Sequence, residues 1–227
     1  MKTIIVLVLI LSLSRLAFAT PFLNLDFESP KANALQDPSV NTIDAIPGWS
    51  LEIGGQPMPK MLYNGTCLSC PDASLFDSQV NGNGKFTFGM TAGTVVGSSP
   101  PVVFSTSVYQ ARDVPGDARS LRFDAKMQGG YLAVSVGGSL TPILDLGMAP
   151  SFFHTYAVDL AGWSGKNTEL RFTINPSPGP FHYGNVQLDN IRFSSEALVT
   201  VPEPSTWALL GVGGGLLFWV AKRPKAT

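Results

Sequence analysis

Apolar and polar residues alternate along most of residues 20–195, in short runs that glycine, proline and asparagine separate. In the run 121–127, for example, Leu121, Phe123, Ala125 and Met127 fall on one side of an extended chain. A period of two is typical of strands that bury one face. No window of twelve residues there repeats apolar residues at the spacing of an amphipathic helix. The pattern predicts an all-β domain of about nine to eleven short antiparallel strands in a β-sandwich, and it favours a jelly roll.

Each expected strand is bounded by turn-forming residues, such as Asn81–Gly84 and the pair Gly137-Gly138. Residues 31–45 and 92–101 are rich in Ser, Thr, Pro and Gly and are expected to be loops. We expect strands at residues 23–27, 49–53, 85–90, 102–111, 121–127, 132–136, 140–146, 156–160, 170–174 and 186–193.

The composition supports a strand-rich fold and weighs against a nucleic-acid partner. The chain contains 23 Gly and 18 Pro in 227 residues, which disfavours a helical bundle. The two terminal segments contain five of the 15 Lys and Arg residues and one of the 16 Asp and Glu residues. The middle of the chain therefore has 10 basic and 15 acidic residues, a net charge of −5. A mildly acidic domain without a basic run is not expected to bind nucleic acid.

The first nineteen residues have the features of a secretory signal peptide. Lys2 precedes an apolar run from Ile4 to Leu13, and Ala17-Phe18-Ala19 matches the small-x-small pattern that signal peptidase cleaves. Ten apolar residues span about 15 Å as a helix, too little to cross a bilayer. Residues 1–19 are therefore expected to be removed, so that the mature chain begins at Thr20 and the sandwich domain occupies residues 20–195.

A second apolar segment lies near the other end of the sequence. Trp207–Ala221 has no charged residue, and the basic residues Lys222, Arg223 and Lys225 follow it. These features predict a transmembrane helix at about residues 206–221, with the basic tail 222–227 as a membrane stop on the cytoplasmic side. The alternative is a final core strand or helix, which the triplet Gly213–Gly215 does not favour.

Between the domain and this segment lie a short linker, residues 196–201, and the sequence Pro202-Glu203-Pro204. The two prolines hold the backbone extended. Followed by a glycine-containing apolar helix and Lys222-Arg223, this motif resembles the PEP-CTERM sorting signal of Gram-negative bacteria, over residues 202–227. The resemblance implies that an exosortase processes the protein, in species that make extracellular polysaccharide. The alternative is a plain membrane anchor.

Several phrases of the middle segment are similar to the galactose-binding-domain-like jelly rolls, which include many carbohydrate-binding modules. They are Leu23–Glu28, Pro47–Trp49, Val158–Lys166, Leu170–Phe172 and Gln187–Ile191. The resemblance implies that the first and last strands lie near each other and that a structural calcium ion is often held there. Glu28 and Asp189 match the positions of such a site, and carboxylate oxygens suit Ca²⁺. Asn190 stands where a second acidic residue is common.

The alternative for Asp189 is structural. A buried aspartate must be paired, hydrogen-bonded or bound to a metal. If Asp189 and Asn190 form a β-bulge, backbone amides satisfy the carboxylate, Val186 and Leu188 face the core, and the alternation shifts by one residue. The sequence leaves the calcium site and the bulge both open.

Exposed aromatic side chains are candidates for stacking on sugar rings. Trp163, Phe181 and Tyr183 lie in expected loops and are the first choices, ahead of Tyr63, Tyr109 and Tyr131, while Trp49 is expected in the core. The alternative for these aromatic side chains is ordinary packing within the fold, without a ligand.

His154 and His182 have no nucleophile or metal-binding motif around them and are expected to be structural. Cys67 and Cys70 are predicted to form a disulfide in an oxidising compartment.

Together these features predict an exported, non-catalytic protein. The precursor is expected to be anchored in the inner membrane, and the processed domain to act on the cell surface or in an exopolysaccharide matrix. A carbohydrate-binding module is the first alternative. A glycan-active hydrolase or lyase is the second, because scattered carboxylates can meet in a cleft, although no spacing singles out a pair.

Overall fold

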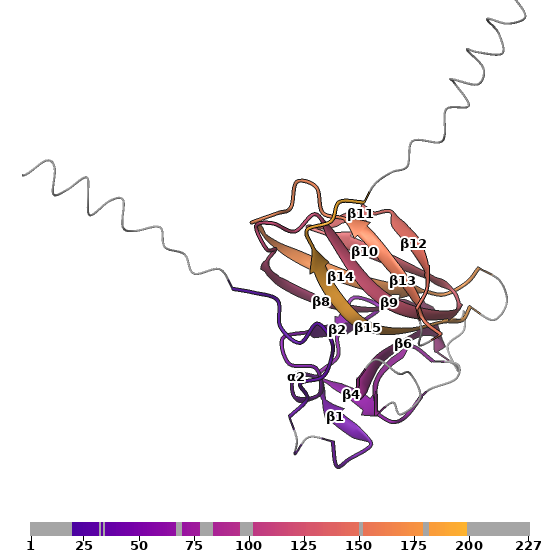
Figure 1. The fold of residues 1–227 in the computed structure, drawn as a ribbon. Helices are drawn as coiled ribbons and strands as arrows, with labels where there is room; N and C mark the ends of the chain where they lie inside the picture. The colour runs from indigo at the N-terminus through magenta and orange to yellow at the C-terminus, as the bar shows by residue number, and fades with distance from the viewer. Residues whose placement is uncertain are drawn as a thin grey trace, which may run out of the picture. The chain divides into compact units, whose positions relative to one another are not determined.

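The computed structural model describes residues 20–31, 33, 35–66, 70–77, 84–95, 102–149, 152–178 and 182–198. Within these ranges the chain forms fifteen strands and one four-residue helix, α2 (Thr42–Ala45), and the strands are arranged in two large sheets (Figure 1). The prediction of an all-β domain is confirmed.

The first sheet contains nine strands. Its order is β1 (Ser39–Asn41), β4 (Lys60–Tyr63), β5 (Asp72–Asp77), β6 (Phe86–Val95), β15 (Gly184–Ser194), β9 (Ser120–Gly129), β13 (His154–Asp159) and β12 (Ile143–Met148), and β7 (Val102–Phe104) pairs with β6. The last strand in the sequence, β15, therefore lies in the middle of the sheet. The pairing of β4 with β5 is parallel, so the expectation of a purely antiparallel sandwich is wrong at this one strand pair.

The second sheet contains six strands, all paired antiparallel. Its order is β11 (Ser139–Thr141), β10 (Tyr131–Val136), β14 (Asn167–Asn175), β8 (Thr106–Asp113), β2 (Ser50–Ile53) and β3 (Gln56–Pro57).

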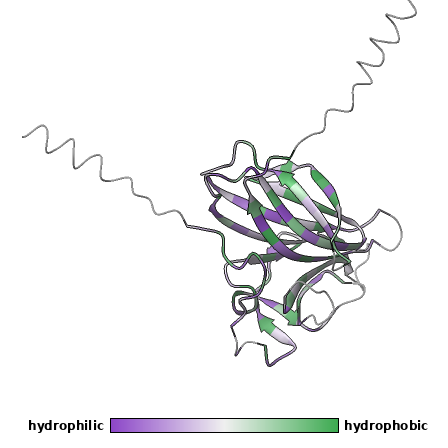
Figure 2. Cartoon of the chain, viewed as in Figure 1, coloured by the Kyte–Doolittle hydropathy of each residue, from purple (hydrophilic) through white to green (hydrophobic). Residues whose placement is uncertain are grey.

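The core lies between the inward faces of the two sheets. Phe172 of β14 meets Phe123 of β9 edge to face at 5.1 Å between ring centroids, and Trp49 packs on Phe172 at 6.3 Å. All three side chains are at most 3% exposed. Hydrophobic and hydrophilic residues alternate along many strands, as the sequence predicts (Figure 2). Two sheets that share one core are consistent with a β-sandwich; the more specific galactose-binding-like jelly roll stays a prediction.

The expected first strand at residues 23–27 is wrong. Residues 22–30 contain a turn instead, in which Asn24 and Phe27 adopt positive φ angles of 50° and 58°. The side-chain oxygen of Asn24 accepts a hydrogen bond from the Ser29 N–H at 2.9 Å. The backbone carbonyl of Asn24 accepts another from Trp49 Nε1, also at 2.9 Å. As a result Phe27 is fully buried, whereas Leu23 is 46% exposed. The hydrogen bonds that Asn24 accepts, one local from Ser29 and one from the distant Trp49, override the alternation here.

Two other expected strands are each divided in two. The run 140–146 is interrupted at Pro142, between β11 and β12, because proline has no N–H to donate to a sheet. The run 102–111 is interrupted at Ser105, whose carbonyl accepts a hydrogen bond from Gly54 N–H at 2.9 Å. The expected loop 31–45 contains β1 and α2, and the expected loop 92–101 begins inside β6.

The compact unit that holds both sheets ends at Ala197, and Leu198–Thr227 form a second unit. The signal peptide 1–19, the motif at Pro202–Pro204, the transmembrane helix at 206–221 and the basic tail lie outside the described residues. Within the described ranges, no helix has the length and apolar character needed to cross a bilayer.

Candidate functional site

The predicted calcium residues Glu28 and Asp189 lie near a bulge in the central strand β15. The pairing of β15 with β9 shifts register between Asp189 and Arg192, and Asn190 there has a φ of 51°. Asp189 is 1% exposed and accepts the Asn190 N–H at 2.6 Å. Val186 and Leu188 are fully buried. This is the β-bulge that the sequence left open as the structural alternative.

Burial raises the pKa of Asp189 to about 7, although the hydrogen bond from the Asn190 N–H acts in the opposite direction. The charges of Glu28, Asp124 and Asp26 raise it further, so the turn at residues 24–28 does bring acidic groups toward Asp189. Glu28 Oε1 accepts the N–H groups of Lys85 and Phe86 at 2.7 and 2.8 Å. One oxygen of Glu28 is therefore already used in holding the start of β6.

Within the described part of the chain, no group of three or more His, Cys, Asp or Glu side chains is arranged to hold a metal ion. Asp124, the neighbouring carboxylate, accepts hydrogen bonds from Thr155 Oγ1 at 2.7 Å and Asn190 Nδ2 at 2.9 Å. The contacts of these carboxylates with protein donors favour a structural role. Calcium binding at Glu28 and Asp189 stays a prediction.

The predicted sugar platform is less open than expected at Trp163. This side chain is partly buried against the core, and its ring lies so close to Gly137 that a Cβ built there would be 2.1 Å from it. Gly137 itself has a φ of 58°. Tyr183 is half-buried, and Phe181 lies outside the described residues. Packing accounts for Trp163, and ligand contact by these aromatic residues stays a prediction.

Two other residues that the sequence singled out, Cys70 and His154, have structural contacts. Cys70 is disulfide-bonded, but Cys67 lies outside the described residues, so their pairing stays a prediction. His154 Nδ1 lies 2.9 Å from Asp145 Oδ2 in an exposed pair on β13 and β12. The Gly147 N–H and His154 together lower the pKa of Asp145.

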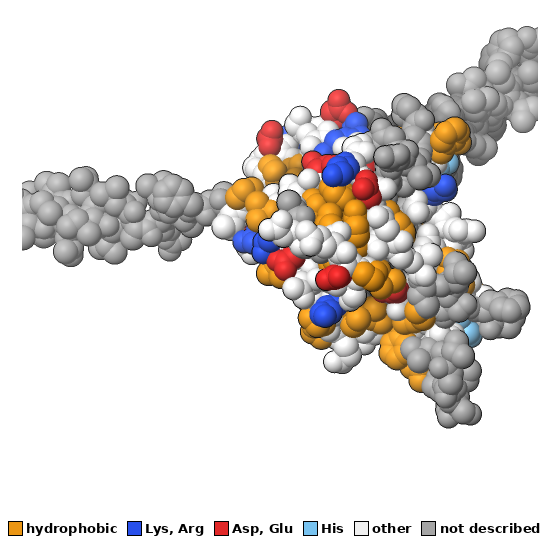
Figure 3. Space-filling view, turned by 90° about the horizontal axis from the view of Figure 1, so that it is seen from below, with side chains coloured by type: hydrophobic (Ala, Val, Ile, Leu, Met, Phe, Trp, Pro, Cys, Tyr) orange, Lys and Arg blue, Asp and Glu red, His pale blue; other side chains and the backbone are white. Residues whose placement is uncertain are grey.

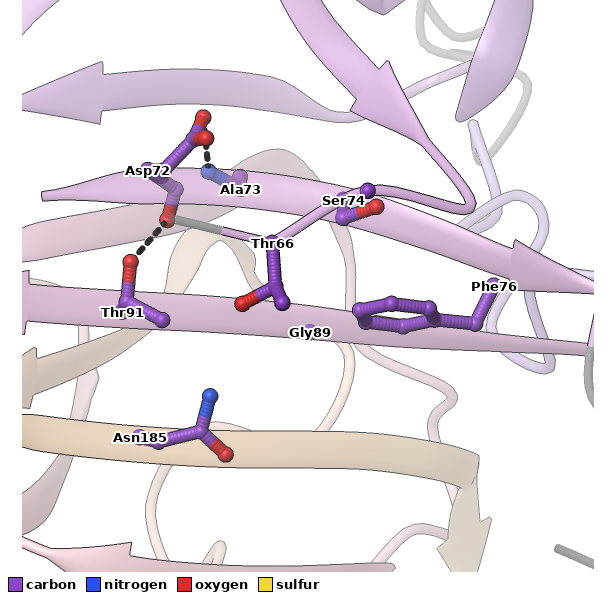
Figure 4. Close-up of a pocket in the computed structure, with 9 residues that line it drawn as sticks. Thr66, Asp72, Ala73, Ser74, Phe76, Gly89, Thr91 and Asn185 are labelled. Carbon is purple, nitrogen blue, oxygen red and sulfur yellow. Dashed lines mark hydrogen bonds between the residues drawn. The ribbon is translucent and has the colours of Figure 1, made fainter. Parts of the chain in front are cut away.

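A small pocket opens on the outer side of β5, β6 and β15 (Figure 4). The ring of Phe76 lies across Gly89, where a Cβ would meet it at 2.6 Å, and Asp72 points away from the ring. Burial raises the pKa of Asp72. The free volume is about 10 Å³, which is room for about one water molecule. This pocket is too small for a sugar.

A group of polar and aromatic side chains lies in contact on the outer face of the six-stranded sheet. Arg171 of β14 is directly opposite Tyr109 of β8, and its guanidinium carbon lies 4.0 Å from the centroid of the Tyr109 ring. Arg171 Nε donates to Glu169 at 2.7 Å and Nη1 donates to Glu52 at 2.6 Å. We refer to Glu52, Tyr109, Glu169 and Arg171 as the Arg171 cluster.

The Arg171 cluster is partly shielded from water although it lies on an outer face. The side chains of Glu52, Arg171 and Glu169 are 18%, 24% and 34% exposed. Burial opposes the charge of Arg171, but its two carboxylate partners outweigh burial and raise its pKa. Arg171 lowers the pKa of Glu52, and the hydrogen bond to Glu52 raises the pKa of Tyr109. At neutral pH, therefore, Arg171 is a cation, Glu52 is a carboxylate and Tyr109 is an uncharged phenol.

A hollow of about 620 Å³ adjoins the Arg171 cluster between α2, β2 and the β3–β4 connection. Tyr109 and Ser50 line both the hollow and the outer face, and apolar side chains of Trp49, Met58 and Ile43 form its other side. The sequence named Tyr109 as a secondary aromatic candidate and Arg171 only within the phrase Leu170–Phe172, and it did not single out Glu52 or Glu169. Only strand pairing brings these residues together, since Glu52 and Arg171 are 119 residues apart in the sequence.

Charges elsewhere are mixed. On the face that Figure 3 shows, Lys and Arg side chains are scattered among Asp and Glu side chains and among apolar ones. That distribution offers no basic stripe on this face.

Comparisons with known proteins bear on the last residues of the chain. The family described as the PEP-CTERM protein-sorting motif matches residues 200–223. The chain carries a PEP-CTERM sorting motif. The motif implies an exported, membrane-anchored precursor that is sorted to the cell surface, with an exosortase as its processing partner. Pro202, Glu203, Pro204, Lys222 and Arg223 fall within the match.

The β-domain lies outside the residues that this family matches. No curated protein matches the chain. Among solved structures, the enzymatically active domain of bacteriophage CBA120 tailspike protein 4 is similar at 16% sequence identity and a TM-score of 0.37, over 65% of this chain and 19% of that chain. A likeness this loose carries no argument about fold or function.

Proposed function

We propose that this protein is a non-catalytic surface or matrix protein of a Gram-negative bacterium, exported as a membrane-anchored precursor and cut by an exosortase. Its β-domain is the displayed module, and its contribution is placement and adhesion in extracellular polysaccharide. The observation that supports this most is the sorting motif at residues 200–223. The compact domain ends at Ala197, so a cut within the motif frees it whole.

Truncation and point variants in a host that contains an exosortase test this proposal. Deleting Pro202–Thr227 is expected to move the domain from the membrane fraction to the soluble exported fraction. Changing Pro202, Glu203 and Pro204 to alanine retains the apolar segment, so uncut precursor is expected to accumulate in the membrane. Thr227→Ala, which lies outside the matched residues and changes no charge, is the control and is expected to be processed normally.

Immunoblots of membrane, surface and medium fractions, with mass spectrometry of the mature termini, distinguish these outcomes. Finding the triple alanine variant cut and distributed like the unaltered protein contradicts exosortase processing. Finding the unaltered chain uncut in the cytosol contradicts export as well.

A further inference from the structure

We propose that the outer face of the six-stranded sheet, centred on the Arg171 cluster, binds a neutral, hydroxyl-rich polysaccharide chain. The inference deepens the proposed function by naming the surface and ligand class through which the displayed domain adheres. It differs from the loop site expected at Trp163, Phe181 and Tyr183.

The first argument is the continuity of the face. Ser135, Arg171, Tyr109 and Ser50 are direct cross-strand neighbours on β10, β14, β8 and β2. Four strands at about 4.8 Å spacing give a track of roughly 14 Å. At its β2 end the track continues into the hollow of about 620 Å³. An extended chain lying across the strands would contact each of these residues in turn.

The second argument is the shape of the face. Beside the track lie small residues, including Ala111, Ala133, Ser107 and Thr173, together with the two carboxylates of the Arg171 cluster, Glu52 and Glu169. The ring of Tyr109 and the guanidinium of Arg171 are planar groups held in contact. Planar, partly buried groups of this kind suit the apolar C–H face of a sugar ring, and holding them in place reduces the entropy lost on binding.

The third argument is hydrogen-bonding capacity. A guanidinium has five N–H donors. Three hydrogen bonds connect Arg171 to Glu52 and Glu169, which leaves two N–H groups for a ligand. Each carboxylate has two oxygens with several acceptor positions, and the serine hydroxyls can donate or accept. Neighbouring donors and acceptors at fixed positions match the adjacent hydroxyl groups of a sugar.

The fourth argument is charge. The Arg171 cluster contains one cation and two carboxylates, so its net charge is negative. Acidic polysaccharides and nucleic acids would be repelled, because each carboxylate or phosphate that they bring would lie near Glu52 or Glu169. Hydroxyl groups do not incur this cost, so the face selects neutral chains.

Affinity electrophoresis of the detergent-solubilised full-length protein tests the proposal. Native gels contain galactomannan, mixed-linkage β-glucan, xylan or dextran as neutral probes, and alginate as the acidic one. We expect at least one neutral polysaccharide to retard the protein and alginate not to. Tyr109→Ala is expected to weaken that retardation by at least tenfold.

Three further variants separate binding from folding. Ser50→Arg places a bulky group on the exposed end of the track and is expected to abolish retardation without lowering the melting temperature. Ser39→Arg, the same change on an exposed residue of β1 in the other sheet, is expected to bind normally, as is Trp163→Ala.

Each contrary outcome is informative. The proposal is overturned if no neutral probe retards the protein, if alginate retards it more strongly, or if Tyr109→Ala and Ser50→Arg bind as the unaltered protein does. Light scattering on the same samples covers a further possibility: if Ser50→Arg changes the oligomeric state instead of the retardation, the face joins copies of this chain. These gels require no processing by an exosortase, so their failure leaves the sorting proposal standing.

Discussion

Replacing Asp189 by asparagine is expected to stabilise the protein at about pH 8 and to change its stability little near pH 4. Asp189 is 1% exposed at the bulge of β15, where its carboxylate accepts a hydrogen bond from the neighbouring Asn190 N–H. Burial, together with the charges of Glu28, Asp124 and Asp26, disfavours its ionised form. Asparagine keeps the shape and the acceptor oxygen but has no charge.

The magnitude follows from the pKa of this carboxyl. An ordinary aspartate titrates near 3.8, whereas the pKa of Asp189 in the folded protein is about 7. Between these values the folded state holds a proton that the unfolded state has lost, so stability falls as pH rises. At ~1.4 kcal/mol for each tenfold change in proton concentration, the loss amounts to about 4 kcal/mol across this window. The full penalty is present above about pH 7 and absent below about pH 4.

Urea unfolding measured at intervals from about pH 4 to pH 8 checks the prediction, in buffers that contain EDTA so that no divalent cation contributes. The Asp189→Asn variant is expected to lack the decline, and the two curves are expected to meet at the acid end. Asp117→Asn is the control, because Asp117 is exposed. If Asp189→Asn and the unaltered protein keep the same pH dependence, the carboxyl is not held in its protonated form and the reasoning is refuted.

Three other predictions concern the remaining candidate residues. Gly137→Ala is expected to lower the free energy of unfolding by about 1–3 kcal/mol, because the φ of Gly137 is 58° and the new Cβ would meet the Trp163 ring. Calorimetry of Gly137→Ala, with and without Trp163→Ala, measures this effect. An unchanged melting temperature in the single variant contradicts the packing role of Gly137. If calcium binds at Glu28 and Asp189, EDTA is expected to lower the melting temperature and Asp189→Ala to remove that response; an EDTA-insensitive melting curve rules the site out. If Cys67 and Cys70 are paired, the intact mass of the exported protein is expected to be two hydrogens below that of the reduced chain, and thiols that react with iodoacetamide without prior reduction contradict the pairing.

Alternation in the sequence predicts some strands of this chain correctly and one of them wrongly. The runs around Phe123 and Phe172 were predicted as strands with these side chains inward, because alternation over six or more residues is decided locally. The run at residues 23–27 has the same alternation and is a turn. There the hydrogen bonds of Asn24 to Ser29 and Trp49 compete with strand pairing, and the partner Trp49 is distant enough in sequence that no local pattern reveals it.

The bulge at Asn190 illustrates a different limit. Inserting one residue into a strand reverses which side chains face the core beyond it, and the sequence of β15 is compatible with either phase. The pairing with β9 selects the bulged phase, in which Val186, Leu188 and Ile191 are all buried.

By itself, the sequence determined the strand-rich character of this protein and the sorting motif near its end, because both depend on the order of neighbouring residues along the chain. Only the tertiary structure decided that Glu52, Tyr109 and Arg171 form one cluster, since three strands from distant parts of the sequence must pair in register to bring them within contact. Strand register depends on the burial of whole sheet faces and on turn geometry, which are sums over many residues that a local pattern does not contain.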